Sequence, residues 1–562
     1  MASFLTRLGI RLRAAGDRGA IRKSRRYPPA SVTRFRPSPK PAGNPVLGTE
    51  LASGRFLLSG REVLIPDNSI WNLKFASSPR FDLLHGFGWL DDFASEGSIR
   101  SRSLALDWTL EWIERFGQGD HVWSWTPAMT GQRIVRWLNH FDFLTATMDP
   151  EEIDGFESSL TRQIWFLNRR ARSSPDGLPA LEALTGLIYG IAAIDLRPTL
   201  AVRASGWVTS WISRNMGPDG GLRSRNPQQL SQALIFMSWA ADAIRACGLE
   251  PSQLHLDAMH RAAGAVRKLR LGNGALARFH GGDAGSTALI DHTIAELGHD
   301  PADDKTSSMG FTRMTNGAAV LVMDTGTWPE SVHGEAAFSS TLAFEFTSGR
   351  SPLLINAGPA ILDDADSEEF ARSPAAHNTL WIAEGLYPLD APPIRPDPPR
   401  TVTAKTGFNH HGSALQAHHD GYAGRFGVVH SRRVELTENG FAFRGEDRLH
   451  PDMPVSRSGR RSGARPKGEP GITVLIGFCV HPDVTVRVDS DDSVVHLVLP
   501  NGETWEFGIS SGALALLPAT VMELDRNELV STTRIVVSSR IQHPESLVRW
   551  SFVCVDRGRS LI

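Results

Sequence analysis

An arginine and a histidine that could do chemistry lie close together in the second half of the chain, in Arg372-Ser-Pro-Ala-Ala-His-Asn-Thr379. A guanidinium group binds a carboxylate or sulfate through paired hydrogen bonds. An imidazole can accept or deliver a proton near neutral pH. We therefore predict that Arg372 and His377, with Asn378 beside them, contact an acidic ligand. The alternative is that these residues only orient a loop.

A second set of side chains could bind or protonate the same ligand. Arg223 and Arg225 follow a Gly-Gly turn, where they either bind an acidic sugar or stand at a solvated helix start. The chain has only four tyrosines. Tyr422 is the most promising phenol and Tyr387 the second, unless they pack structurally on a hairpin.

Several tryptophans fall near predicted loops and helix ends, namely Trp71, Trp89, Trp123 and Trp125. An indole face can stack on a sugar ring, so Trp125 is a candidate for substrate binding; the alternative for each is the helical core. The three cysteines are scattered and form neither a metal spacing nor a disulfide framework. The pairs His410-His411 and His418-His419 lack an accompanying carboxylate pattern, so we expect surface or hairpin residues.

The elements that must position these side chains change character along the chain. A length of 562 residues predicts two domains or more. Between about residues 65 and 297 the apolar residues recur every three or four residues, which predicts an α/α toroid over 49–300. From Gly317 they recur at two, with Asn439-Gly440 and Asn501-Gly502 as hairpin turns, which predicts an antiparallel β-sandwich over 301–562.

The first 48 residues differ from the rest in charge. Residues 1–40 carry a net charge of +10 within a chain whose total is −2. We expect a disordered basic leader, or else a short amphipathic helix lying on an anionic membrane surface. No secretory signal and no apolar run long enough to span a bilayer is recognised. The overall charge indicates no nucleic-acid partner.

Several segments in both halves resemble the heparinase II/III family in order and spacing. They are Leu84–Asp92, Trp125–Leu138, Asp219–Pro227, Thr341–Asn356, Arg372–Thr379, His419–Tyr422, Gly445–Leu449 and His481–Val484. The resemblance implies a helical toroid followed by a β-sandwich. It also implies a polysaccharide lyase that cleaves a uronate-containing glycan by β-elimination, in which a cation or amide neutralises the carboxylate while a base and an acid move protons. His377 would be the base or its partner, Tyr422 the proton donor, and Arg225 and Arg372 the carboxylate clamps.

The chain departs from the family's pattern at several positions. The family's amide and tyrosine segments match Leu178–Glu182 and Asn226–Leu230, its His-x-His-x-Asp motif matches Ala336–Ser340, and the following Asp is Asn356. His333 lies just upstream and could take over substrate contact. One histidine cannot hold zinc, which needs about four ligands, so we expect neither metal nor cofactor.

Two other classes of function stay open. A toroid can carry a glycoside hydrolase, for which Asp176, Glu182 and Asp219 are the available carboxylates. A glycan-binding protein that kept the fold and lost the chemistry is the second alternative, and the missing amide and tyrosine favour it. A bacterial envelope glycan is the expected ligand, and the family suggests a periplasmic or envelope location.

Overall fold

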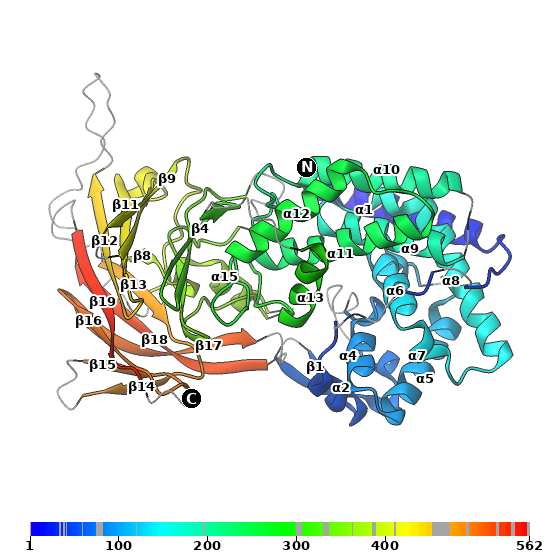
Figure 1. The fold of residues 1–562 in the computed structure, drawn as a ribbon, viewed down its shortest axis with the longest axis horizontal. Coiled ribbons are helices and arrows are strands. Elements are labelled where there is room, and N and C mark those ends of the chain that lie inside the picture. The colour runs from blue at the N-terminus through cyan, green and yellow to red at the C-terminus, as the bar shows by residue number, and fades with distance from the viewer. Residues whose placement is uncertain are drawn as a thin grey trace, which may run out of the picture.

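The computed structural model consists of a helical half and a β half (Figure 1). It describes residues 2–558 except 33–34, 38–39, 41, 59, 75–82, 120, 195, 197, 299–305, 330–336, 362–363, 385–388, 390, 410–411, 452–472, 490–493, 524–527 and 541–545. The helices of the first half end at Leu297, and the main sheets begin at Ser307. The expected order of an α/α toroid followed by an antiparallel β-sandwich is confirmed. No described helix has the length and apolar character that crossing a membrane requires.

Several helices of the helical half begin at clear capping signals. Asp149 caps its helix in a reciprocal box with Glu152, and Thr126 and Asn226 each cap a helix whose first residue is proline. The helices are α2 (Pro45–Ala52), α4 (Gly88–Glu96), α5 (Ile99–Phe116), α6 (Pro127–Asn139), α7 (Phe141–Thr145), α8 (Pro150–Arg170), α9 (Leu178–Ala193), α10 (Pro198–Asn215), α11 (Pro227–Ala246), α12 (Gln253–Lys268) and α13 (Thr287–Leu297).

Helices α6 and α9 approach each other closely at two glycines. A Cβ on Gly131 would lie 2.3 Å from the Glu182 carbonyl oxygen, and one on Gly186 would lie 2.4 Å from Gly131 Cα. Only glycine allows two helix backbones to meet at this distance. Trp71, Trp89 and Trp125 are buried in the helical core, whereas Trp123 is 43% exposed.

The basic leader is a helix and a docked segment, which corrects the expectation of a disordered leader. Helix α1 (Ala2–Ser24) packs on α8, and its buried Asp17 accepts a hydrogen bond from Arg170 Nε at 2.6 Å. Further along, the Tyr27 ring stacks on Trp165 with centroids 3.7 Å apart. These contacts join residues more than a hundred positions apart, which is why local composition did not reveal them.

The β half consists of three antiparallel sheets. The eight-stranded sheet has the order β14-β15-β16-β19-β12-β11-β10-β9, the four-stranded sheet β17-β18-β13-β8, and the five-stranded sheet β3-β4-β5-β6-β7. Their strands are β3 (Ser307–Ser308), β4 (Phe311–Asn316), β5 (Ala319–Asp324), β6 (Phe344–Ser348), β7 (Ser351–Leu354), β8 (Leu380–Ala383), β9 (Val402–Asn409), β10 (Gly412–His419), β11 (Val428–Thr437), β12 (Ala442–Pro451), β13 (Thr473–Cys479), β14 (Thr485–Val488), β15 (Val495–Val498), β16 (Thr504–Ile509), β17 (Ala513–Glu523), β18 (Glu528–Arg540) and β19 (Ser546–Asp556). Both predicted Asn-Gly turns join neighbouring strands.

A long hairpin connects the two halves at one side. Strands β17 and β18 extend under the molecule toward β1 (Arg55–Leu58) and β2 (Arg61–Leu64), as Figure 1 shows. A Cβ on Gly60, in the β1–β2 turn, would lie 2.5 Å from Leu529 Cγ of β18. The helical and β halves therefore touch both at the chain crossing and through this hairpin. The short helix α15 (Ala365–Arg372) lies between β7 and β8 in the sequence.

Candidate functional site

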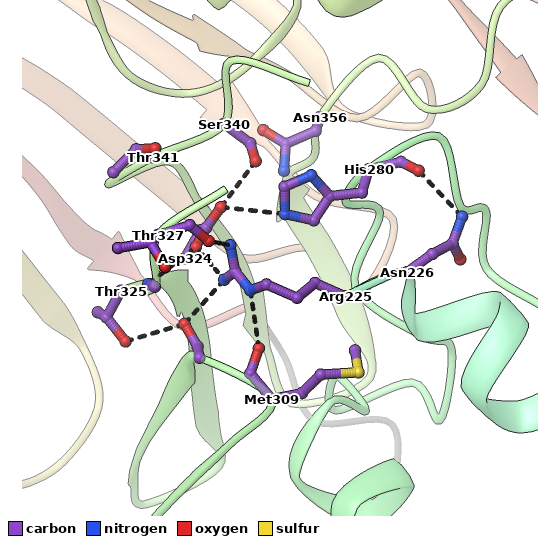
Figure 2. Close-up of polar contacts among 12 residues, drawn as sticks. Arg225, Asn226, His280, Met309, Asp324, Thr325, Thr327, Ser340, Thr341 and Asn356 are labelled. Carbon is purple, nitrogen blue, oxygen red and sulfur yellow. Dashed lines mark hydrogen bonds and ion pairs between the residues drawn. The ribbon is translucent and has the colours of Figure 1, made fainter. Parts of the chain in front are cut away.

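A buried ion pair joins the helical half to the β half (Figure 2). Arg225, in the turn before α11, donates from Nη2 to Oδ1 of Asp324 at the end of β5. It also donates to the carbonyl oxygens of Met309, Gly310 and Thr327, at 3.0, 3.0 and 2.6 Å. Four hydrogen bonds thus hold its guanidinium within the protein. Arg225 therefore ties the domains together and is not available as the substrate clamp that the sequence suggested.

Asp324 is the centre of this network. Its side chain is 0% exposed. Its Oδ2 accepts from Ser340 Oγ at 2.7 Å and lies 3.5 Å from His280 Nε2. Burial alone would raise the pKa of Asp324, but Arg225 and His280 outweigh burial and hold the pKa below its usual range. Burial lowers the pKa of His280.

An amide network continues from this pair toward β13. Asn378 donates from Nδ2 to the carbonyl oxygens of Phe344 and Ile355, and its backbone N–H donates to Asn356 Oδ1 at 2.9 Å. Asn356 in turn donates to the Arg278 carbonyl at 3.1 Å. Asn378 is 0% exposed. It therefore holds neighbouring backbone segments together and does not make the predicted contact with substrate.

His377 and Arg372, the first two candidates, have different surroundings. His377 is 4% exposed, its Nδ1 pairs with the Ser373 carbonyl at 2.9 Å, and its ring lies edge-on to Phe338. Burial lowers the pKa of His377 to about 4, so the imidazole is neutral at pH 7. Arg372 is partly exposed at the end of α15 and pairs with Glu368 at 2.5 Å.

Tyr422 lies in the core of the β half. It is 1% exposed, and its hydroxyl donates to the Leu380 carbonyl at 3.2 Å. Burial raises its pKa above the usual range. A phenol enclosed in this way cannot protonate a polysaccharide, so the structure corrects the predicted role. Tyr387 lies outside the described residues.

Of the other predicted contacts, only Arg223 faces solvent. It borders a cavity of about 270 Å³ between the turn before α11 and the β half, together with Asp219 and Thr327. Trp125 is 0% exposed and donates from Nε1 to the Phe116 carbonyl at 2.8 Å, so it cannot stack on a sugar. His333 lies outside the described residues.

The carboxylates proposed for a glycoside hydrolase are engaged within the protein. Asp176 accepts from Arg214 and Asn215. Glu182, which is 8% exposed, accepts from Gln132 at 2.8 Å. Asp219 accepts from the backbone N–H groups of Gly221 and Met309. The three therefore serve local structure.

The positions that match the family's metal motif do not fit a divalent ion. Phe338 contributes a ring, Ser340 donates to Asp324, and both ends of the Asn356 amide are hydrogen-bonded. His377 alone offers a ligand atom, and zinc needs about four. Within the described part of the chain, no group of three His, Cys, Asp or Glu side chains could hold a metal.

A second buried network was not foreseen from the sequence. Arg432 pairs with both oxygens of Asp447 at 2.7 and 2.9 Å and donates to the Asn378 carbonyl at 2.6 Å. His430 contacts Asp447 at 2.7 Å, and His419 contacts His430 at 3.2 Å. His419 is therefore a core residue, contrary to the expected surface position, whereas His410-His411 lies outside the described residues.

Comparisons with known proteins agree with this architecture. Residues 299–551 match the model of the family "Heparinase II/III-like, C-terminal". A crystal structure of heparinase III superposes with a TM-score of 0.66 at 14% identity, over 97% of this chain and 92% of that chain. A heparan sulfate lyase HepC mutant from Pedobacter heparinus gives 0.57 at 13% identity, over 96% and 88%. Residues 299–551 are thus a heparinase II/III-like C-terminal domain, and the chain as a whole has the fold of heparinase III.

One relative matches nearly the whole chain, and its name refers to FtsZ and not to a polysaccharide. The FtsZ-localized protein C of Caulobacter vibrioides is 26% identical over 537 residues, which are 91% of this chain and 88% of that protein. The domain match and the superposition therefore show the fold of polysaccharide-lyase-like proteins.

Proposed function

We propose that this protein recognises an acidic, uronate-containing glycan and does not cleave it by β-elimination. The observation that carries the proposal is the placement of the phenols. Gln229 stands where the family has its tyrosine. Among the described tyrosines, Tyr189 and Tyr422 are at most 1% exposed, and Tyr27 stacks on Trp165. Elimination needs an acid for the departing oxygen, and none of these three tyrosines lines either of the two cavities, beside Arg223 and beside Arg372.

The loss of the carboxylate-neutralising amide supports the same proposal. The matching segment, at the start of α9, has Leu178 where the family has its Asn, and an apolar side chain cannot neutralise the carboxylate of a uronate. Binding alone has no such requirement. It needs exposed cations beside a cavity, which Arg223 and Arg372 supply at two places.

A polysaccharide lyase is the second candidate, and the heparinase II/III-like C-terminal domain favours it. In that case His377 would act as the base or its partner, Arg372 would hold the uronate carboxylate, and His333 would contact substrate. The histidine keeps its position in the Arg-x4-His-Asn element and is neutral at pH 7, as a base must be.

One assay separates the two candidates. The purified protein is mixed with a panel of uronate polysaccharides, and ultraviolet absorbance and glycan binding are followed together. Elimination leaves a conjugated double bond that absorbs, so absorbance that rises with wild type but not with His377→Ala would establish the lyase and refute our proposal. Binding without absorbance is the expected result. Arg223→Gln should weaken that binding, whereas Arg214→Gln, which changes another exposed arginine of the helical half, should not.

The similarity to the FtsZ-localized protein C suggests where such a protein acts. We propose that this chain, too, gathers with FtsZ at the division site, where its basic N-terminal helix contacts the anionic membrane surface. A fluorescent fusion should form a band at midcell that disperses when FtsZ is depleted. A fusion that stays diffuse in dividing cells would refute this location. Binding of the purified protein to anionic but not neutral vesicles tests the membrane contact.

A further inference from the structure

A larger cavity lies on the β half, away from the ion pair of Arg225 and Asp324. Helix α15 forms one wall and the segment Pro392–Arg395 the other, and the space between them is about 570 Å³. That volume falls within the roughly 300–1,000 Å³ of typical small-molecule sites. The cavity is distinct from the smaller one beside Arg223.

Two guanidinium groups converge at one end of this cavity. Arg395 donates from Nε to Ser339 Oγ at 3.1 Å and lies over the Trp328 ring at 4.9 Å, which fixes its direction. Arg372 lines the same end. Burial lowers the pKa of Arg395, and the nearby charge of Arg372 lowers it further. Glu368, which also lines the cavity, offsets part of this charge, because its Oε1 lies 2.5 Å from Arg372 Nη2. An anion that reaches both guanidinium groups would complete the neutralisation.

A hydroxyl group at the same end has no protein partner. Ser373 is 7% exposed, and among the described residues its buried Oγ makes no hydrogen bond. Buried hydroxyl groups are normally paired, because leaving one unpaired costs about 1–3 kcal/mol. Since Ser373 lines the cavity beside Arg372, a polar ligand would complete its bonding.

The remaining lining of the cavity has apolar and acidic surfaces. Phe370 is 41% exposed, and Pro392 and Pro393 offer further ring faces on which a sugar ring can pack. Asp366 and Glu369 are exposed at the rim. Their oxygens accept hydrogen bonds from hydroxyl groups, but they repel a second negative charge.

We propose that this cavity binds a single sugar unit that carries one carboxylate, such as the terminal hexuronate of a glycan. The carboxylate lies between Arg372 and Arg395, and Ser373 donates to it. The ring lies on Phe370 and the prolines, with its hydroxyl groups toward the acidic rim. The proposal rests on the proposed recognition of uronate glycans, and it narrows the ligand at this second site to a unit without sulfate.

Calorimetric titration with free glucuronate, glucose and a sulfated uronate disaccharide tests the site. Wild type should bind glucuronate and neither of the others. Arg395→Gln should weaken glucuronate binding by about tenfold or more, whereas Arg400→Gln, an exposed arginine away from the cavity, should leave it unchanged. A loss of binding in Arg395→Gln would also follow if the lost contact with Ser339 disturbed the fold. Glu369→Lys avoids this ambiguity, because Glu369 is exposed and this variant should gain a ligand. It should let the sulfated disaccharide bind.

Either of two results would overturn the site: absence of glucuronate binding to wild type, or binding that neither Arg395→Gln nor Glu369→Lys alters. If Arg223→Gln still weakens binding of the polysaccharide, the proposed function stands without this cavity. Conversely, glucuronate binding that depends on Arg395, in a protein that binds no polymer, would refute the proposed function and leave the monosaccharide site.

Discussion

Replacing Asp324 by Asn should destabilise the junction between the two halves. The change keeps the shape of the side chain but removes the charge that pairs with Arg225. Both side chains are at most 10% exposed, and breaking a buried ion pair from one side costs about 3–5 kcal/mol. Three carbonyl oxygens still accept from Arg225 in the variant. We therefore expect the lower end, a loss of about 3 kcal/mol.

Urea unfolding followed by tryptophan fluorescence and circular dichroism measures this loss as a shift of the first transition. Asp291→Asn is the matched control, because its ion pair with Arg270 has an aspartate that is 63% exposed and should change stability by at most about 1 kcal/mol. Equal losses in the free energy of unfolding from the two substitutions would show that burial does not decide how much an ion pair stabilises the protein, and would refute this prediction.

The pH dependence of the same variant has a definite sign. The folded-state pKa of Asp324 lies below its usual value. The carboxylate therefore contributes stability that is fully present above the unfolded pKa, about 3.9, and is lost as pH falls through the folded pKa. Wild type and Asp324→Asn should consequently converge in stability at low pH and differ most near neutrality. A constant difference between pH 3 and pH 7 would contradict this assignment.

The remaining predictions concern three other buried groups. Tyr422→Phe should cost about 1 kcal/mol and leave glycan binding and any lyase activity unchanged; activity lost without loss of stability would restore the catalytic role. Burial raises the pKa of Glu345 to about 7, so the folded state binds the extra proton and stability should fall as pH rises from about 4.3, the unfolded value, through 7. Melting temperatures at pH 5 and pH 8 should show this fall in wild type and not in Glu345→Gln. Asp447→Asn should lower stability by about 3 kcal/mol, because it leaves Arg432 buried without its charge partner; a loss below 1 kcal/mol in urea unfolding would contradict it.

The two-part fold could be predicted because its signal is local. Periodicity at three and four, then at two, is repeated over many segments, and Asn-Gly turns mark the hairpins. One buried ion pair could also have been predicted from the position of a hairpin turn. Arg432 and Asp447 face each other in the register of β11 and β12, placed symmetrically about the Asn439-Gly440 turn. Counting outward from that turn would have brought the arginine and the aspartate together.

The candidate site was harder to predict because its contacts cross the chain. Arg225 meets Asp324 across 99 positions, and Arg170 meets Asp17 across 153. Nothing in the residues beside Arg225 distinguishes a guanidinium that faces a cleft from one held by carbonyl oxygens. A resemblance to a family also carries the roles of its residues along with their positions. Tyr422 received a catalytic role because the family's chemistry needs a phenol and the chain has only four tyrosines, although it lies in the β core.

The departures from the family's pattern follow from how buried polar positions can change. A buried side chain that loses its ligand still has neighbouring N–H and C=O groups to satisfy. Asn356, in place of the family's aspartate, does so by accepting from the Asn378 backbone and donating to the Arg278 carbonyl. Phe338, at a position of the histidine motif, fills its space against His377 with a ring. Each replacement removes a metal ligand and keeps the junction packed, so selection for the fold alone accounts for them. What it does not explain is the hydroxyl of Ser373, which has no hydrogen-bond partner among the described residues and lies beside two arginines that line one cavity. That cavity is therefore the part of this molecule where a retained ligand should be sought.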